Sequence, residues 1–275
     1  MRHVLILSRA SDGHVERMEQ ELERLGASWV LVDPGAFPAQ ANLFARMEQE
    51  PSMCLTLPGG RLLHLEEIGA VWYRRPSPIK AEASLPDLQR LFIERETRAG
   101  LWGLLRAIDG LWVNHPGANS EAAWKPQQLA LAMRLGLAIP RTLITNEPDA
   151  LRRFYQECQG QVVYKLLGFP GYEVEDGAIA SLYTSRVPES LLQEAHRIAG
   201  TAHLFQAFQE KICDVRVIII GQQVFAVEIH PLSEETRLDF RRDYGALRYA
   251  VHTLPAALEK ALLAMTRAYG LQYAA

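Results

Sequence analysis

Short apolar runs alternate with an amphipathic stretch at the start of the chain. Residues 3–8 have the pattern of a buried strand, and the apolar positions after Asp12 recur at helical spacing until Gly26. A second apolar run covers residues 28–33. A strand, a helix and a strand in this order favour a parallel sheet. The pattern therefore predicts an α/β unit at the N-terminus.

The same unit is expected to contain a hairpin and a long helix. Pro58-Gly59-Gly60 separates two apolar runs, which is typical of a hairpin turn. The predicted elements are strands at 53–57, 61–65, 70–75 and 112–116 and a helix at 85–108. The inward positions of that helix are expected to be Leu88, Leu91, Phe92, Leu101, Leu104, Leu105 and Ile108. We place the first domain boundary near residue 116.

The second half of the chain also mixes helix and strand patterns. Helices are predicted around Lys125–Met133, after a cap at Asn146 with Pro148 in the first turn, and from Pro255 to Tyr269. Residues 139–143 are expected to be extended. Strands are predicted at 162–167, 182–187, 215–220 and 224–229, with a last one beginning at Leu271. Gly221-Gln222-Gln223 predicts an antiparallel hairpin between two of them.

Composition narrows the class of protein. The chain has 275 residues, 48% hydrophobic and 22% charged, as in ordinary soluble globular proteins. A net charge of -3 provides no basic field for nucleic acid. No apolar stretch has the length of a membrane span or a signal segment. Three cysteines without metal-like spacing favour a reducing cytoplasm.

Two lysines in apolar surroundings are candidates for phosphate binding. Lys165 lies within a predicted strand, where a buried ammonium group is costly without an anion. Lys125 lies near the start of a predicted helix. Each lysine taken alone also fits a solvated surface position. Gly168-Phe169-Pro170-Gly171 could lay N–H groups against phosphate oxygens, and an ordinary turn explains it equally well.

Further candidates lie on the next predicted strands. Phe205-Gln206-Ala207-Phe208 could present main-chain groups to an adenine edge, or form a strand end packed in a core. Asp214 and Arg216 share one strand face and could bind a ribose and a phosphate, or form a structural ion pair. Residues 238–243 read as a polar loop whose arginines could steer an anion. The histidines have no metal-ligand spacing, and no GxSxG motif is present.

The order of these segments resembles the ATP-grasp superfamily, and specifically the ATP-grasp peptide maturases that make microviridin- and marinostatin-type graspetides. The residues that carry the resemblance are Trp72-Tyr73-Arg74-Arg75-Pro76, Asn114-His115-Pro116, Lys125-x-x-Gln128-Leu129, Gly136 to Asn146, Val163-Tyr164-Lys165, Tyr183 to Val187, Phe205-Gln206, Asp214-Val215-Arg216, Val224 to Ile229 and Asp239-Phe240-Arg241. The distinction from ribosomal-protein glutamate ligases rests mainly on Trp72–Pro76 and Thr184–Val187.

The resemblance implies an α/β (α+β) ATP-grasp fold with an N-terminal pre-ATP-grasp domain. The implied domains are 1–116, a central domain at 117–203 and a C-terminal ATP-grasp domain at 204–275. By the same resemblance, Lys125 and Lys165 would hold the phosphates of ATP, and Asp214 would take the ribose. Gln206 and the backbone of Ala207 and Phe208 would surround the adenine. Arg216 and Arg241 would face the transferred phosphoryl group as catalytic residues.

The implied activity is ligation within a ribosomal precursor peptide. An Asp or Glu side chain is activated as an acyl phosphate, and a Ser, Thr or Lys side chain closes an ester or amide ring. The implied cofactors are ATP and Mg²⁺. The implied partners are the leader and core of the precursor peptide and a second copy in a homodimer, with no nucleic acid and no membrane. The alternatives are an amino-acid ligase of the glutamate-ligase type and a non-catalytic module that binds nucleotide or leader peptide.

One departure from the family concerns the metal. In the relatives, the strand that begins like Gly270–Ala275 continues into an Asp and later a Glu-x-Asn that bind magnesium. None of these residues follows here. We expect either a truncated version of a longer enzyme or a protein that is not catalytic as it stands, and truncation is favoured.

Overall fold

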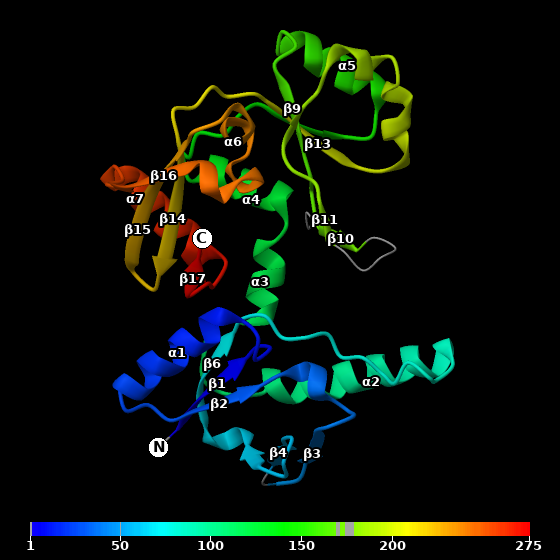
Figure 1. The fold of residues 1–275 in the computed structure, drawn as a ribbon, viewed down its shortest axis with the longest axis vertical. Coiled ribbons are helices and arrows are strands. Elements are labelled where there is room, and N and C mark those ends of the chain that lie inside the picture. The colour runs from blue at the N-terminus through cyan, green and yellow to red at the C-terminus, as the bar shows by residue number, and fades with distance from the viewer. Residues whose placement is uncertain (1, 50, 169–170, 174–178) are drawn as a thin grey trace. The chain divides into compact units, whose positions relative to one another are not determined.

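A computed structural model of the chain describes residues 2–49, 51–168, 171–173 and 179–275. It separates into two compact units, Met1–Pro116 and Gly117–Ala275 (Figure 1). Each unit has its own sheets and is described by itself. The division of the second unit between residues 203 and 204 stays a prediction.

A parallel sheet forms the centre of the first unit. Its strand order is β2-β1-β6-β7, and all three neighbouring pairs are parallel. The strands are β1 (His3–Leu7), β2 (Trp29–Val32), β6 (Ile68–Tyr73) and β7 (Leu111–Val113), and the helices are α1 (Gly13–Arg24) and α2 (Asp87–Arg106). Asp12 caps α1 by accepting the N–H of His14. The predicted strand–helix–strand unit is confirmed.

A small antiparallel sheet is the second part of this unit. It contains β3 (Asn42–Arg46), β4 (Ser52–Thr56) and β5 (Leu62–His64), with 3₁₀ turns at Pro34–Ala36 and Leu65–Glu67. Gly59 and Gly60 have φ angles of +82° and +85°, which only glycine adopts without strain, so the predicted hairpin turn is confirmed. Strand β3 was not predicted, because all five of its residues are exposed and no buried face marks it.

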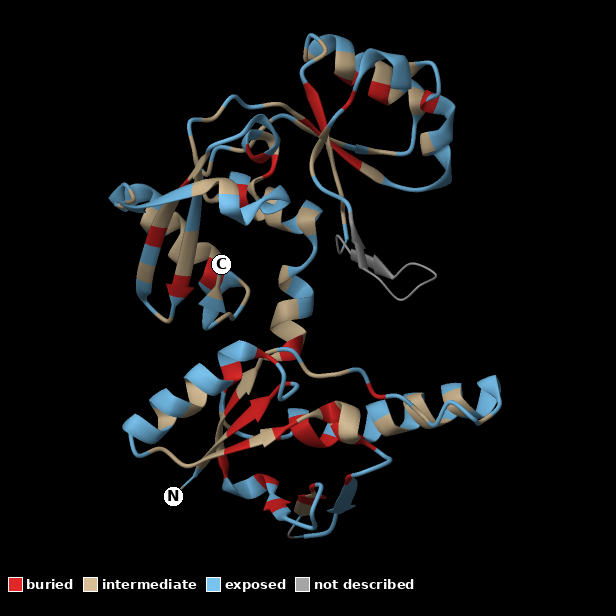
Figure 2. Cartoon of the chain, viewed as in Figure 1, coloured by how far each residue is buried: buried red, intermediate tan, exposed pale blue. Residues whose placement is uncertain are grey.

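The core of the first unit lies between the parallel sheet and the C-terminal half of α2. Leu101 and Leu105 are fully buried there against strand residues such as Leu5 and Leu7. The predicted inward positions at the other end of α2 are wrong. Leu88, Leu91 and Phe92 are 78%, 44% and 66% exposed. Figure 2 shows this end of the helix as mostly exposed, because the sheet covers only the other half.

The second unit begins with two short helices and an antiparallel sheet of order β12-β9-β13-β8. The elements are α3 (Pro116–Ala122), α4 (Lys125–Arg134), α5 (Pro148–Glu157), β8 (Thr142–Thr145), β9 (Val162–Lys165), β12 (Ser185–Arg186) and β13 (His203–Ala207), with the paired strands β10 (Gly171–Glu173) and β11 (Ile179–Ser181) and 3₁₀ turns at Glu189–Leu192 and Ala195–Gly200. Leu151 and Phe154 of α5 pack on Val162 and Phe205 in a core of their own.

Two local predictions in this sheet need correction, and one alternative is confirmed. The N-cap of α5 is Glu147 rather than Asn146, and its side chain makes no capping bond, since the Thr145 hydroxyl accepts the Glu147 N–H instead. The strand expected at 182–187 contains only Ser185–Arg186. Residues 205–207 form the end of β13, which is the packed strand end that the sequence offered as one alternative.

A second antiparallel sheet of order β16-β15-β14-β17 completes this unit. Its elements are β14 (Asp214–Ile220), β15 (Gln223–Pro231), β16 (Leu247–His252), β17 (Tyr273–Ala274), α6 (Glu234–Leu238) and α7 (Ala256–Ala268), with 3₁₀ turns at Phe240–Arg242 and Tyr244–Ala246. The β14–β15 hairpin is confirmed. Residues 238–243, predicted as a loop, form the end of α6 and a 3₁₀ turn, because Ser233 and Asp239 cap these turns.

Among the residues that the structure describes, no helix is both long and apolar enough to cross a membrane.

Substitutions at the two ends of α2 test where the core of the first unit lies. Leu101→Ala is expected to lower the free energy of unfolding by about 2–5 kcal/mol, because a fully buried side chain leaves a cavity. Leu88→Ala on the same helix is expected to change it by less than about 0.5 kcal/mol. Urea denaturation followed by circular dichroism measures both. Equal effects of the two substitutions would contradict this description of the core.

Candidate functional site

A polar cavity of about 320 Å³ lies within the second unit. Its walls come from the ends of β9 and β13, the start of β14 and the turn after α6. The charged residues that line it are Lys165, Lys211, Asp214, Arg216, Asp239 and Arg241. Seven of the eight residues predicted for binding or catalysis line this cavity, and Lys125 is the exception.

Lys165 is the last residue of β9 and is half-buried. Burial lowers the pKa of its ammonium group, and the nearby charges of Lys211 and Arg241 lower it further, while Asp239 and Asp214 oppose them. Among the described residues, the ammonium group has no hydrogen-bond or ion-pair partner. A partly desolvated cation without a partner is a site for an anion.

Lys125 is the first residue of α4 and reaches the same region. Its ammonium group donates to the carbonyls of Leu166 and Gly168, just after β9. Burial lowers the pKa of Lys125, followed by repulsion from Arg241 and Lys165. The structure therefore brings the two predicted lysines together, although they are forty residues apart in the sequence. Their contact with phosphate stays a prediction.

Asp239 holds Arg241 at the edge of the cavity. Its carboxylate is only 4% exposed and accepts hydrogen bonds from Arg241 Nε at 2.8 Å and Nη2 at 2.6 Å. Burial by itself raises the pKa of Asp239, but the bonds from Arg241 and from the Thr184 N–H outweigh it and lower the pKa to about 2. The sequence prediction missed Asp239 as a positioning residue. Its spacing of two from Arg241 was the available signal.

Asp214 and Arg216 are two residues apart on β14 and lie on the same face of the strand, as predicted. Both carboxylate oxygens of Asp214 accept hydrogen bonds from Lys211, at 2.8 and 2.7 Å. Asp214 therefore forms an ion pair with Lys211 rather than with Arg216, and a ribose would have to share this carboxylate with Lys211. Lys211 was not predicted as a site residue, because nothing in the sequence distinguishes it from a surface lysine.

The end of β13 restricts how an adenine could bind. The N–H of Ala207 donates to the Arg141 carbonyl and the N–H of Phe208 donates to the Gln161 carbonyl. Neither N–H group remains for a ligand, so only the carbonyl groups of this segment could meet an adenine edge. The Gln206 side chain is buried and donates to the Thr142 hydroxyl at 2.9 Å.

The ring of Phe208 already has one covered face. The guanidinium carbon of Arg186 lies 3.3 Å from the centre of the ring. An aromatic ligand could therefore stack only on the other face or beside the ring. The predicted loop Gly168–Gly171 is described only in part, because Phe169 and Pro170 lie outside the described residues.

The charges at this site do not balance. Lys125, Lys165, Lys211, Arg216 and Arg241 supply five cations, whereas Asp214 and Asp239 supply two carboxylates. Burial, followed by repulsion from neighbouring cations, already lowers the pKa of both Lys125 and Lys165. An anion of several negative charges would relieve this repulsion.

A magnesium ion does not fit the carboxylates of this cavity as they stand. Mg²⁺ needs free oxygen ligands in octahedral geometry. Asp214 is paired with Lys211 and Asp239 with Arg241. We therefore assign no magnesium ligand to the described residues and derive no step through the metal.

A second, more apolar cavity of about 560 Å³ borders the first. It runs along β14 and α7, where Val217, Leu262 and Met265 line it. Asp214, Arg216 and Phe240 line both cavities. Arg216 can therefore contact groups in either one.

The Asp239–Arg241 pair generates a pH prediction. A carboxyl whose pKa falls from 3.8 to about 2 on folding contributes about 2 kcal/mol of stability. This contribution is complete above about pH 4 and disappears as the pH falls towards 2. Asp239→Asn should lower the free energy of unfolding at neutral pH and weaken its decline between pH 4 and pH 2.

Urea denaturation across this pH range measures the effect. Asp149→Asn is the matched control, because Asp149 pairs with Arg152 on the same unit's surface with its side chain 79% exposed. It should keep the wild-type decline. A wild-type decline in Asp239→Asn would contradict the assignment.

Comparison with known proteins adds independent findings. Residues 3–119 match the family model of the MvdD pre-ATP grasp domain. The search of curated proteins found no match. Among solved structures, the chain is similar to macrocyclase MdnC from Microcystis aeruginosa MRC, bound with precursor peptide MdnA, at 26% identity and a TM-score of 0.85, covering 98% of this chain and 85% of that one.

Two other structures are similar over the same extent. A Chryseobacterium gregarium RiPP-associated ATP-grasp ligase, in complex with ADP and a leader and core peptide, has 26% identity and a TM-score of 0.90, covering 99% and 83% of the two chains. Macrocyclase MdnB from Microcystis aeruginosa MRC has 28% identity and a TM-score of 0.79, covering 99% and 85%. The chain therefore has the ATP-grasp fold with an MvdD-type pre-ATP-grasp domain at its N-terminus, and its resemblance to the ATP-grasp peptide maturases is confirmed.

Proposed function

We propose that this protein is an ATP-dependent ligase that closes ester or amide rings in a ribosomal precursor peptide. The observation that carries the proposal is the cluster of five cations around a cavity with only two carboxylates. The similarity to two macrocyclases and to a ligase in complex with ADP and a leader and core peptide supports the choice of reaction.

Lys125 and Lys165 hold the phosphates in this proposal. Lys165 has a partly desolvated ammonium group without a partner among the described residues, and Lys125 stands beside it at the start of α4. Phosphate oxygens would accept charge-assisted hydrogen bonds from both, which are stronger than neutral ones. Binding would also remove the repulsion that lowers the pKa of each lysine.

Arg216 and Arg241 act on the reacting groups. Asp239 fixes the guanidinium plane of Arg241 through two hydrogen bonds, so this residue is oriented before any ligand binds. Arg216 lines both cavities, so it can contact the phosphoryl group on one side and a peptide carboxylate on the other. The phosphoryl group and the tetrahedral adduct are both negative, and both would be stabilised.

The reaction has two steps with a balanced exchange of groups. A peptide carboxylate oxygen attacks the terminal phosphorus of ATP, and ADP leaves, which forms an acyl phosphate. A hydroxyl or amine of the same peptide then attacks the acyl carbon, its proton passes to solvent, and phosphate leaves. The peptide therefore loses the atoms of one water molecule per ring. The oxygen leaves within the phosphate, and a proton passes to solvent. The magnesium requirement, the homodimer and the cytoplasmic location stay predictions.

Replacement of the two lysines tests the nucleotide site. Lys125→Met and Lys165→Met are each expected to weaken ATP binding by about 10–100-fold, because each removes a charge-assisted hydrogen bond. Isothermal titration calorimetry measures the affinity. Lys260→Met, on the exposed side of α7, is the matched control and should bind ATP as the wild type does.

Stability separates a binding role from a structural one. Lys165→Met should leave the free energy of unfolding unchanged or raise it, because it removes a desolvated charge. Wild-type ATP affinity in both lysine variants would overturn the proposed nucleotide site.

Mass spectrometry tests the proposed reaction. Incubated with ATP, Mg²⁺ and a precursor peptide encoded beside its gene, the protein should lower the peptide's mass by one water per ring and release ADP and phosphate. Arg216→Gln should slow this by about 100-fold or more, and Arg267→Gln on the exposed surface of α7 should not. A gain in peptide mass would instead indicate an amino-acid ligase, and an unchanged mass without ATP consumption would indicate a non-catalytic binding module.

A further inference from the structure

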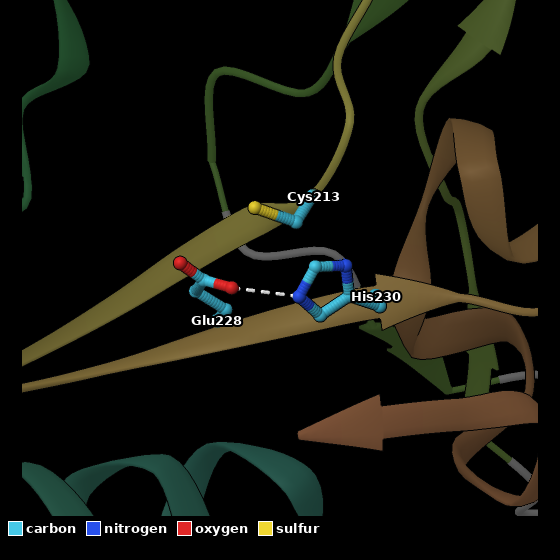
Figure 3. A group of neighbouring side chains, drawn as sticks. All are labelled: Cys213, Glu228 and His230. Atoms are coloured by element: carbon cyan, nitrogen blue, oxygen red, sulfur yellow. Dashed lines mark hydrogen bonds and ion pairs between the residues drawn. The ribbon is translucent and has the colours of Figure 1, made fainter. Parts of the chain in front are cut away.

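Three side chains of different chemistry meet on the β14–β15 hairpin. Cys213 lies directly before β14, and Glu228 and His230 lie on β15 (Figure 3). A thiol sulfur, a carboxylate oxygen and an imidazole nitrogen from these residues all lie within 4.8 Å of one another. The nitrogen Nε2 of His230 is 2.7 Å from Oε2 of Glu228. No part of the proposed ligase reaction uses this group.

The strand register explains why these side chains converge. Asp214 pairs with Ile229 and Val215 pairs with Glu228, so Cys213 continues the ladder opposite His230. Residues paired across a ladder share one face of the sheet, and the next residue along points to the other face. Glu228 and His230 therefore lie on the opposite face of the sheet from Asp214 and Arg216. Those two residues line the polar cavity of about 320 Å³, which is called the phosphate cavity below. The cluster is therefore a site separate from that cavity.

A fourth side chain supports the cluster from the neighbouring strand. Nδ1 of His252 on β16 is 2.8 Å from Oε1 of Glu228, so both oxygens of this carboxylate are engaged. All three donor residues are half-buried, so the group is partly shielded from solvent but open to an ion.

We propose that Cys213, Glu228 and His230 bind a zinc ion, with His252 as the residue that orients Glu228. Thiolate sulfur, imidazole nitrogen and carboxylate oxygen are the three ligand types that Zn²⁺ takes in proteins. Magnesium prefers oxygen ligands alone, so this donor set is unsuited to the metal that accompanies ATP. Three protein ligands leave the fourth tetrahedral position for water.

Zinc binding requires a small local rearrangement and the loss of one proton. Zinc–ligand distances of about 2.0–2.3 Å place the ion between the three donors, where it replaces the direct contact of His230 with Glu228. The sulfur–zinc bond forms as the Cys213 thiol proton leaves to solvent. The proton that His230 Nε2 donates to Glu228 moves to Nδ1 of the same ring, which frees the Nε2 lone pair for zinc. The metal then joins the segment before β14 to β15.

An ion at this position would also restrict the movement of one wall of the phosphate cavity. Cys213 lies between Lys211 and Asp214, whose ion pair lines the cavity on the other face. Fixing Cys213 to β15 would restrict the connection between β13 and β14 that carries Lys211. The zinc site therefore steadies a wall of the nucleotide site without contacting the nucleotide.

Cobalt and zinc titrations of the reduced, metal-free protein test the proposal. Co²⁺ bound to a thiolate produces a near-ultraviolet charge-transfer band, which should saturate at one equivalent and be displaced by Zn²⁺. Cys213→Ser should abolish this band, and His230→Ala should weaken zinc binding by at least about 10-fold. His252→Gln should weaken it by about 10-fold through the orientation of Glu228. Cys158→Ser is the control and should bind as the wild type does.

A second measurement on the wild type needs no variant. Zinc should protect Cys213 from alkylation by iodoacetamide, as peptide mapping would show, and leave the modification of Cys158 unchanged. A cobalt band that persists in Cys213→Ser, or alkylation of Cys213 at the same rate with and without zinc, would overturn the proposal. Neither experiment contains ATP or peptide, so its outcome is independent of the proposed ligase activity.

Discussion

Repulsion among positive groups that are only partly hydrated is the constraint on which the proposed site depends. After burial, repulsion from Arg241 and Lys165 lowers the pKa of Lys125. Repulsion from Lys211 and Arg241 adds to burial in lowering the pKa of Lys165. Asp239 offsets part of this repulsion, and its very low exposure makes its pairing with Arg241 strong. The remaining positive charge has no counter-ion among the described residues. A polyphosphate would supply that counter-ion. The positive charges that repel one another in the free protein would then favour the bound state.

The fold builds this cluster from elements that are distant in sequence. The start of α4, the end of β9, the first residues of β14 and the turn after α6 each contribute one or two charged groups. Each group extends from the end of a regular element, where the backbone is held by neighbouring strands. The strand alternation of the β14–β15 hairpin also separates two kinds of chemistry, with Arg216 on the cavity face and Glu228 on the other. One hairpin can thus serve an anion and a metal cation without mixing them.

Local patterns in the sequence predicted the elements that bury a regular face. The first strand–helix–strand unit, the hairpin at Gly59-Gly60 and the β14–β15 hairpin have clear periodicity and glycine turns. The exposed strand β3 has no such pattern and was missed. The N-terminal half of α2 has apolar residues at helical spacing, but Leu88, Leu91 and Phe92 are exposed. Periodicity alone could not predict that these side chains stay exposed.

The candidate site was predictable only where a single residue conflicted with its surroundings. Lys165 stood out because it interrupts an apolar strand. Lys211 and Asp239 did not, because each is one charged residue among others until the fold pairs it with Asp214 or Arg241. Cys213, Glu228 and His230 have no metal-ligand spacing along the chain, and only the strand register brings them together.

The most direct test of the central claim is a crystal structure of the protein with a non-hydrolysable ATP analogue. The account predicts phosphate oxygens within about 2.7–3.2 Å of the ammonium nitrogens of both Lys125 and Lys165. An analogue bound elsewhere, with Lys165 still without an anionic partner and Lys125 still on the Leu166 carbonyl, would contradict it.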